Sequence, residues 1–185
     1  MHDEPGNDLE KRFWGRCPLF AATALFHFVP GGKVQKALHR MKYEGDAGTG
    51  NALGKLLGHR LMGSERFRNL ASVVHVPLHP DKLKERGFDQ SELIAQGIST
   101  VMEIPHYPNL LHRVTATSTQ TRRGRYERWR NVSGAFRAGA IPSSLKTPIL
   151  LVDDVLTTGA TLEACAHMLL RKGVEPVAVA TIASP

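Results

Sequence analysis

The stretch Ile149–Thr161, ILLVDDVLTTGAT, constrains the fold of this 185-residue chain more than any other segment. Its first four residues are apolar, which is typical of a central parallel strand that is buried on both faces. Two aspartates follow, and Thr-Thr-Gly then leads into a helix that we predict over Thr161–Arg171. A strand, a glycine-containing loop and a helix in this order predict an α/β fold with a parallel sheet.

The same segment predicts chemistry at the carboxyl end of its strand. Ligands of open α/β sheets bind in the crevice beyond the carboxyl ends of the strands. Asp153 and Asp154 stand at that edge, and carboxylates accept hydrogen bonds from sugar hydroxyls. The free N–H groups of a helix start, with Gly159 allowing close backbone approach, form a phosphate site. Two carboxylates beside such a site suit a ribose 5-phosphate. The alternative is an acidic strand end followed by an ordinary helix cap.

Strands and helices alternate along the rest of the chain. We predict strands at 70–77, 110–114 and 177–182, helices at 33–43 and 52–62, a glycine-rich turn at 44–51 and a polar loop at 78–88. Asp89 followed by Glu92 predicts a capping box at the start of a further helix. The apolar stretch 18–30 fits either a core-packing helix or an extended arm.

Composition narrows the class of protein. The chain is 42% hydrophobic and 22% charged, the profile of a soluble globular protein. It has no apolar run of about 18 residues and no secretory signal pattern, so we expect a cytoplasmic protein without a membrane partner. Its two cysteines, Cys17 and Cys165, exclude a disulfide framework and a cysteine-only zinc site.

The formal net charge of +7 is concentrated in one segment, TQTRRGRYERWR, at 119–130. A basic balance fits a nucleic acid, an anionic membrane or a polyphosphate ligand. The segment offers few large apolar residues opposite its arginines, which argues against a membrane-surface helix. We interpret it as a mobile anion-binding loop, and the alternative is a solvated basic face.

Four segments together resemble the ComF family of the type I phosphoribosyltransferase superfamily, which is named for competence protein F in DNA uptake. They are HRMKYEGD, VPLHPDKLKERGFDQSE, RVTATSTQTRRGRYERWRNVSGAF and LLVDDVLTTGATLEACAHML, in the family's order. The resemblance implies the type I phosphoribosyltransferase fold, a central mostly parallel β-sheet flanked by helices, with a small N-terminal hood region. We expect an N-terminal arm and helical hood at 1–62, packed on a core at 63–185.

The resemblance also implies roles for individual residues towards phosphoribosyl pyrophosphate (PRPP). Asp153 and Asp154 resemble the catalytic pair that binds the ribose hydroxyls. The 5-phosphate loop would be Thr157, Thr158, Gly159, Ala160 and Thr161. The pyrophosphate loop would be Val76, Pro77, Leu78 and His79, continued by Arg86 and Gly87. The flexible loop that closes over the active site in this superfamily would be 119–130, with Arg122, Arg123, Arg125, Arg128 and Arg130.

As an activity, the resemblance implies an enzyme that transfers the phosphoribosyl group of PRPP to a nitrogenous acceptor and releases pyrophosphate. Mg²⁺ would be bound mainly through PRPP, with Asp153 and Asp154 as the candidate protein contacts, and no histidine spacing predicts a transition-metal site. The residues leave the acceptor unnamed. Two alternatives stay open: a non-catalytic module that acts in DNA uptake through DNA or a protein partner, and a catalytic remnant. The net charge permits DNA contact, and related folds often form homodimers.

The chain departs from the family pattern at two places. Only Cys17 precedes the predicted catalytic region, so we expect the four-cysteine zinc-binding domain common in the family to be missing, and Asp89 replaces a common asparagine. Other residues permit two interpretations. Lys42-Tyr43 is either a helix end or functional, and His79 is a weak candidate for ligand contact. We predict His75 to be a core histidine and Cys165 to be buried packing.

Overall fold

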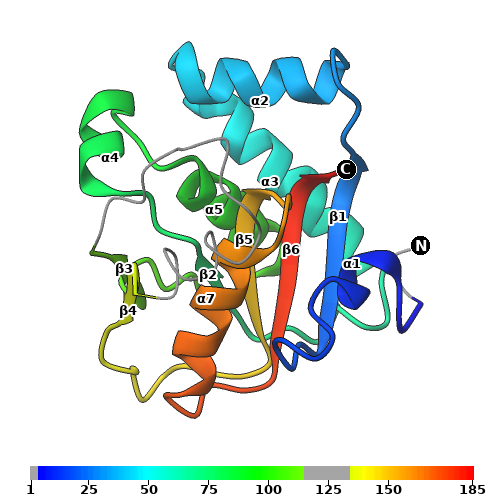
Figure 1. Cartoon of the computed structure of the whole chain (residues 1–185), viewed down its shortest axis with the longest axis vertical. Coiled ribbons are helices and arrows are strands. Elements are labelled where there is room, and N and C mark those ends of the chain that lie inside the picture. Colours follow the sequence, from blue (N-terminus) through cyan, green and yellow to red (C-terminus); the bar gives the residue numbers. More distant parts are fainter. Residues whose placement is uncertain (1–3, 115–133) are drawn as a thin grey trace.

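The centre of the fold is a four-stranded parallel sheet. In the computed structural model, which describes residues 4–114 and 134–185, the strands lie in the order β1, β6, β5, β2. They are β1 (Ala21–His27), β2 (Ser72–His75), β5 (Ile149–Val155) and β6 (Val177–Ser184). Helices flank the sheet (Figure 1). The predicted α/β class is confirmed, and the architecture is consistent with the type I phosphoribosyltransferase fold.

The sheet is covered on both faces because its central strands are apolar almost throughout. Ile149–Val152 and all eight residues of β6 are buried. One core lies between the sheet and α7 (Ala160–Leu170). The other lies between the opposite face and the helices α3 (Ala47–Met62) and α5 (Gln90–Met102). The acidic side chains of β5 therefore occur only near its carboxyl end, where the apolar run stops.

Helices α3 and α5 pack with their backbones in close contact. A Cβ atom at Gly54 would lie 2.2 Å from the Ile94 carbonyl oxygen, and one at Gly97 would lie 2.4 Å from that of Asn51. Only glycine leaves room for this approach. The pair of helices therefore packs as one closely fitted layer against one face of the sheet.

The start of α3 corrects one prediction. The glycine-rich turn predicted at 44–51 is largely helical, because α3 begins at Ala47 and the Asp46 carboxylate accepts a hydrogen bond from Thr49 N at 3.1 Å. The glycines of this segment lie at a helix interface as well as in a turn, and composition alone does not distinguish these two roles. The preceding helix α2 (Lys33–Tyr43) has the predicted bounds and lies at the carboxyl edge of the sheet (Figure 1).

Strand β1 resolves the apolar stretch at 18–30 in favour of extended structure. It pairs in parallel with β6, from Ala21 beside Ala178 to His27 beside Ser184. It therefore belongs to the sheet of the core, although it lies in the part of the chain predicted to form the arm and hood. The division at residue 62 stays a prediction. The short helix α1 (Asp8–Lys11) packs beside β1.

Two further elements differ from the predictions. The polar loop predicted at 78–88 contains a helix, α4 (Pro80–Arg86), which has no buried residue and so shows no apolar period. The predicted strand at 110–114 is β3 (Leu111–Arg113), and it pairs antiparallel with β4 (Phe136–Ala138), which the sequence analysis missed. Three-residue strands are too short to show a clear alternation.

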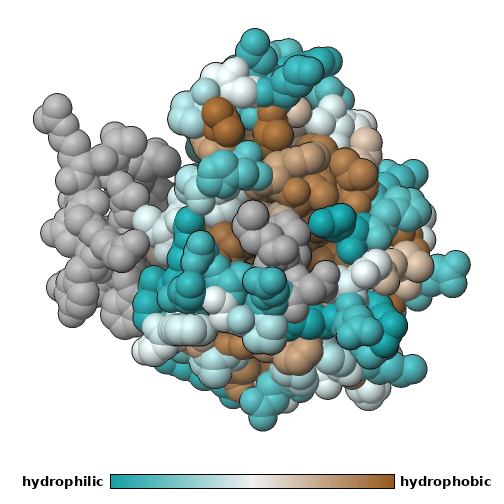
Figure 2. Space-filling model, turned by 90° about the vertical axis from the view of Figure 1, so that its right-hand side faces the viewer, coloured by the Kyte–Doolittle hydropathy of each residue, from teal (hydrophilic) through white to brown (hydrophobic). Residues whose placement is uncertain are grey.

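One side of the molecule carries an apolar surface area. Figure 2 shows a continuous hydrophobic area on the side where β1 forms the edge of the sheet. Phe20 and Val29, which flank β1 in sequence, are 43% and 55% exposed. Within the described residues, no helix is long and apolar enough to cross a membrane.

The predicted homodimer stays a prediction.

Candidate functional site

The two aspartates of β5 are held by different partners. The Asp153 carboxylate accepts hydrogen bonds from Ser91 Oγ at 3.0 Å and from the backbone N of Asp154 at 2.9 Å. Asp154 is only 6% exposed, and its Oδ2 lies 2.5 Å from Lys42 Nζ. Lys42 belongs to the last turn of α2 and Ser91 to the first turn of α5. Two helices distant in sequence thus converge on the predicted ribose pair.

The pair is electrostatically unusual for carboxylates. Burial raises the pKa of Asp153 to about 7, and the neighbouring Asp154 carboxylate adds to the increase. Hydrogen bonds from Asp154 N and Ser91, and the charge of Lys42, act in the opposite direction. Perturbed carboxyl groups at a strand end are a feature of functional sites as well as of structural ion pairs. The site therefore favours groups that donate hydrogen bonds or carry positive charge.

The predicted 5-phosphate loop forms a small cavity with Asp153 in its wall. The cavity has a volume of about 30 Å³ and is lined by Asp153 and by residues 155–162. Gly159 has φ +80° and immediately precedes α7, a left-handed conformation that favours glycine. The N–H groups of the first helical turn have no intrahelical acceptors, so they can face an anion. The predicted loop residues and one predicted ribose ligand are therefore contiguous in space.

Sequence reasoning missed the N-terminal segment that supports this loop. Arg12 Nη1 donates to the Thr157 carbonyl oxygen at 2.9 Å, and the buried Phe13 ring would lie 3.1 Å from a Cβ atom at Gly159. Arg16 forms an ion pair with Glu163 of α7. No periodicity in residues 4–20 signalled these contacts, because they are made by single side chains on a short helix and turns.

The predicted pyrophosphate loop follows β2, the strand beside β5. Val76 and Pro77 are buried, and the backbone N of Leu78 donates to Asp89 Oδ2 at 2.6 Å. His79 caps α4, since its Nδ1 accepts from Asp81 N at 3.2 Å. Because neighbouring parallel strands end at the same edge of a sheet, this loop and the phosphate loop flank the aspartate pair.

Arg86 continues the same side of the site. Its guanidinium donates to Gln90 Oε1 at 2.9 Å and lies 5.4 Å from the centre of the Tyr43 ring. Such a distance suits a cation–π contact. The last turn of α2 therefore contacts both the aspartate pair, through Lys42, and the pyrophosphate side, through Tyr43.

Asp89 connects the predicted pyrophosphate loop to the start of helix α5. Its Oδ1 accepts from the backbone N of Ser91 at 2.9 Å and of Glu92 at 3.3 Å, which confirms the predicted N-cap of α5. Its other oxygen holds Leu78. Burial raises the pKa of Asp89, against the hydrogen bonds that it accepts. One carboxylate therefore positions both the pyrophosphate loop and the helix that carries the Asp153 partner.

A buried histidine, His75, lies next to Asp89 and contacts His106, which is half-buried. His75 Nε2 is 3.8 Å from Asp89 Oδ2, and His75 Nδ1 is 3.0 Å from His106 Nε2. Burial lowers the pKa of His75 to about 4, and burial together with His75 lowers that of His106 to about 4. His75 is 5% exposed, so it is a core histidine, as predicted. Cys165 is fully buried in the core, also as predicted.

Some predictions fall outside the structure or concern a bound metal. The predicted flexible loop at 119–130, with its arginines, lies outside the described residues. Among the residues that are described, no cluster of three or more His, Cys, Asp or Glu side chains could hold a metal ion. Asp153 and Asp154 still offer the carboxylate oxygens that Mg²⁺ uses when a phosphate ligand supplies further oxygens, so the residues fit such an ion.

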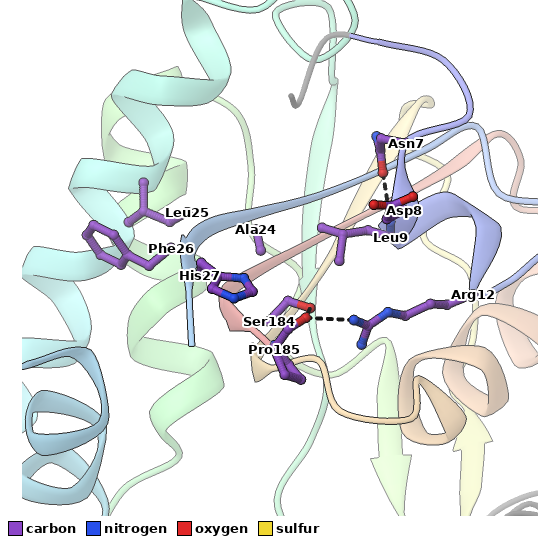
Figure 3. A pocket seen from close by; sticks show the side chains of 10 residues that line it. All are labelled: Asn7, Asp8, Leu9, Arg12, Ala24, Leu25, Phe26, His27, Ser184 and Pro185. Atoms are coloured by element: carbon purple, nitrogen blue, oxygen red, sulfur yellow. Dashed lines mark hydrogen bonds between the residues drawn. The ribbon is translucent and has the colours of Figure 1, made fainter. Parts of the chain in front are cut away.

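A larger hollow lies beside the phosphate loop, at the carboxyl ends of β1 and β6. Its volume is about 380 Å³. Arg12 extends along it and donates to the Pro185 carbonyl oxygen at 2.7 Å (Figure 3). The other residues that line it are Asn7, Asp8, Leu9, Ala24, Leu25, Phe26, His27 and Ser184. Arg12 therefore connects this hollow to the phosphate loop.

Comparison with known proteins gives relatives over most of the chain. Competence protein F of Haemophilus influenzae is 30% identical over 146 residues, which cover 77% of this chain and 64% of that protein. DNA utilization protein YhgH of Escherichia coli K12 is 32% identical over 150 residues, which cover 77% and 63% respectively. Competence protein ComFC of Bacillus subtilis is 30% identical over 140 residues, which cover 76% and 55%. No protein-family model matches the chain.

The chain thus spans less than two thirds of the length of these relatives. The resemblance inferred from four sequence segments and the similarity to curated proteins agree with each other. Over the region that it shares with them, the chain belongs to the ComF family, the family of competence protein F.

Proposed function

We propose that the chain binds PRPP together with Mg²⁺ at the carboxyl edge of the sheet and transfers its phosphoribosyl group to a nitrogenous acceptor. The observation that carries this proposal is the junction of Asp153 with the cavity at 155–162. A hydroxyl-binding carboxylate beside a helix-start phosphate site matches the two ends of ribose 5-phosphate. The loop after β2 lies on the other side of the aspartates, where the pyrophosphate of PRPP would extend.

In this proposal the residues act mainly by positioning and charge. The start of α7 and the threonines at 157, 158 and 161 hold the 5-phosphate, and Asp153 and Asp154 accept hydrogen bonds from the ribose hydroxyls. The bond from C1 of ribose to the pyrophosphate oxygen breaks as the nitrogen of the acceptor bonds to C1, and the pyrophosphate leaves with the electron pair. Mg²⁺, when bound, offsets the negative charge of the pyrophosphate. Holding the reacting groups in place lowers the entropic part of the barrier.

Isothermal titration with Mg²⁺ and PRPP tests the donor half of this proposal. We expect saturable binding to the wild-type chain and none to the double variant Asp153→Asn with Asp154→Asn, because neutral amides bind a divalent cation, and accept hydrogen bonds from hydroxyls, much more weakly than carboxylates do. Glu65→Gln, at a carboxylate that is 87% exposed and far along the chain, is the matched control. Absence of heat and of a thermal shift with wild-type protein at millimolar PRPP would refute donor binding.

The transfer step needs its own measurement because the acceptor is unnamed. Pyrophosphate release from PRPP should depend on an added nitrogenous compound and should disappear in the Asp153→Asn, Asp154→Asn variant. A pool of bases and amines, divided until one active component remains, would identify the acceptor. Binding of PRPP without pyrophosphate release from any pool would favour a catalytic remnant.

A second proposal rests on the names of the relatives, which refer to competence and to DNA utilization. In it, the chain serves DNA uptake as a module that contacts DNA or a protein partner, and the net charge of +7 supports DNA contact. Its affinity for DNA should then fall linearly with salt on logarithmic axes, and should depend on Arg122–Arg130. A fluorescence-anisotropy titration at several salt concentrations measures this, and a flat response would exclude an electrostatic DNA interface.

A further inference from the structure

The last turn of α2 makes two contacts that its own packing does not require. Lys42 Nζ lies 2.5 Å from Asp154 Oδ2, and the Tyr43 ring lies 5.4 Å from the Arg86 guanidinium. The inner face of α2 is already anchored by Leu38 and Met41, which are 3% and 0% exposed. Tyr43 is 64% exposed, so it contributes little to the core. The two residues instead span the space between β5 and α4.

The charges around Asp154 show why the Lys42 contact matters. Asp153 is the adjacent residue, and the Asp89 carboxyl group is near enough to interact with the charge of Asp154. Lys42 offsets this concentration of negative charge, since its side chain is 24% exposed and reaches Asp154 directly. A donor with three phosphate groups would meet the same carboxylates. The phosphate groups of such a donor would be repelled by these carboxylates. Binding therefore requires positive charge, either from a cation that binds with the donor or from a side chain within the site.

We propose that Lys42 is a substrate-binding residue whose ammonium group neutralises Asp154 in the empty site and moves to a phosphate oxygen of PRPP when a divalent cation takes its place beside Asp154. The inference rests on the proposed function and adds to it a residue from the hood region. Lysine suits this exchange because its ammonium is a compact charge with three donors on a flexible stem. Arg86, held by Tyr43 and Gln90, defines the neighbouring pyrophosphate side.

The variant Lys42→Met makes two measurable changes of opposite sign. With the competing ammonium removed, the aspartate pair should bind a divalent cation alone more tightly, which titration of Mn²⁺ by electron paramagnetic resonance measures as a severalfold gain. Affinity for PRPP with Mg²⁺ should fall by about tenfold or more, because a charge-assisted hydrogen bond to phosphate is lost. A residue with only a structural role would not shift these two affinities in opposite directions.

Lys36→Met is the matched control, since Lys36 is an exposed lysine of the same helix. It should leave both affinities unchanged. Thermal unfolding checks that Lys42→Met retains its fold, and Lys42→Gln, which still donates a hydrogen bond to Asp154, takes its place if the methionine variant unfolds. The gain in Mn²⁺ affinity is expected for both variants.

The outcomes separate this inference from the proposed function. Wild-type protein that binds PRPP with the same affinity as Lys42→Met would overturn the role of Lys42 and leave donor binding intact. Loss of both affinities in a folded variant would also overturn it, in favour of a structural role. Wild-type protein that does not bind PRPP at all would overturn the proposed function and this inference together.

Discussion

The predicted phosphate loop and the predicted pyrophosphate loop lie at the same edge of the sheet but are built in different ways. The phosphate loop is one uninterrupted segment, and residues 155–162 form almost the whole wall of its cavity. The pyrophosphate loop depends on Asp89, which lies eleven residues beyond the Leu78 N–H that it holds. The buried His75 lies against Asp89, and the half-buried His106 contacts His75. Both loops were proposed from the sequence, but the side-chain network that holds the second one became visible only in the fold.

The largest expected effect concerns this network and pH. The pKa of His75 is about 4 in the folded chain and 6.5 as an ordinary value, so the unfolded state binds more protons between these values. The stability that neutral His75 contributes is therefore present above pH 6.5 and lost as pH falls towards 4, at most about 3 kcal/mol. Chemical denaturation of wild type and His75→Asn across this range should show a flatter dependence in the variant.

The comparison between the two proteins isolates the contribution of His75 together with its effect on His106, whose pKa it helps to lower. Asp89 also titrates with a raised pKa, which acts in the opposite direction, but it is present in both proteins. Equal pH dependence in wild type and variant would mean that the pyrophosphate side does not rest on a neutral histidine, and the contrast between the two loops would lose its physical basis.

Gly159→Ala tests the phosphate loop at its most constrained backbone position. The residue has φ +80°, and a Cβ atom there would lie 3.1 Å from Phe13. We expect the free energy of unfolding to fall by about 1–2 kcal/mol, and binding of ribose 5-phosphate and of PRPP to weaken equally. Gly48→Ala, at a helical position with room for a methyl group, should not weaken either. Unchanged ribose 5-phosphate affinity in Gly159→Ala would place the phosphate elsewhere.

Asp89→Asn should separate the two loops by ligand. In wild type, Asp89 Oδ2 accepts a hydrogen bond from the Leu78 N–H at 2.6 Å. The asparagine amide keeps its oxygen as the acceptor for Ser91 N and Glu92 N, but its NH₂ group faces the Leu78 N–H and cannot accept from it. We expect PRPP affinity to fall by about tenfold, the loss of roughly one hydrogen bond. Ribose 5-phosphate, which lacks the pyrophosphate, should bind to the variant with the same affinity as to wild type. Parallel titrations with both ligands measure this, and an equal loss for both would contradict the division into two loops.

The smallest expected effect comes from Arg12→Met. The guanidinium donates to the Thr157 and Pro185 carbonyl oxygens, and Arg12 is only partly buried. Its loss should lower the free energy of unfolding by about 0.5–1 kcal/mol and weaken ribose 5-phosphate binding only slightly. Arg171→Met, at an exposed arginine, is the control. Identical behaviour of the two variants would show that Arg12 does not support the predicted phosphate loop.

Much of the fold was predictable because its strongest signals are local. The apolar runs of β5 and β6 and the Asp89 cap of α5 were read correctly from consecutive residues. The errors have physical causes as well. Helix α4 buries nothing and has no apolar period. The glycines of α3 serve a helix contact, in which Gly54 meets Ile94, so a glycine-rich composition indicated a turn where a helix stands.

By itself, the sequence determined the order of buried strand, acidic pair, glycine-containing loop and helix in Ile149–Thr161, because each of these features depends on neighbours along the chain. Tertiary structure alone decided what surrounds them. It brought Lys42 to Asp154, Ser91 to Asp153 and Arg12 to Thr157. The partners in the last contact are 145 positions apart. Such contacts follow from how helices pack on a sheet, as in the close approach of α3 to α5, and no local pattern encodes that geometry.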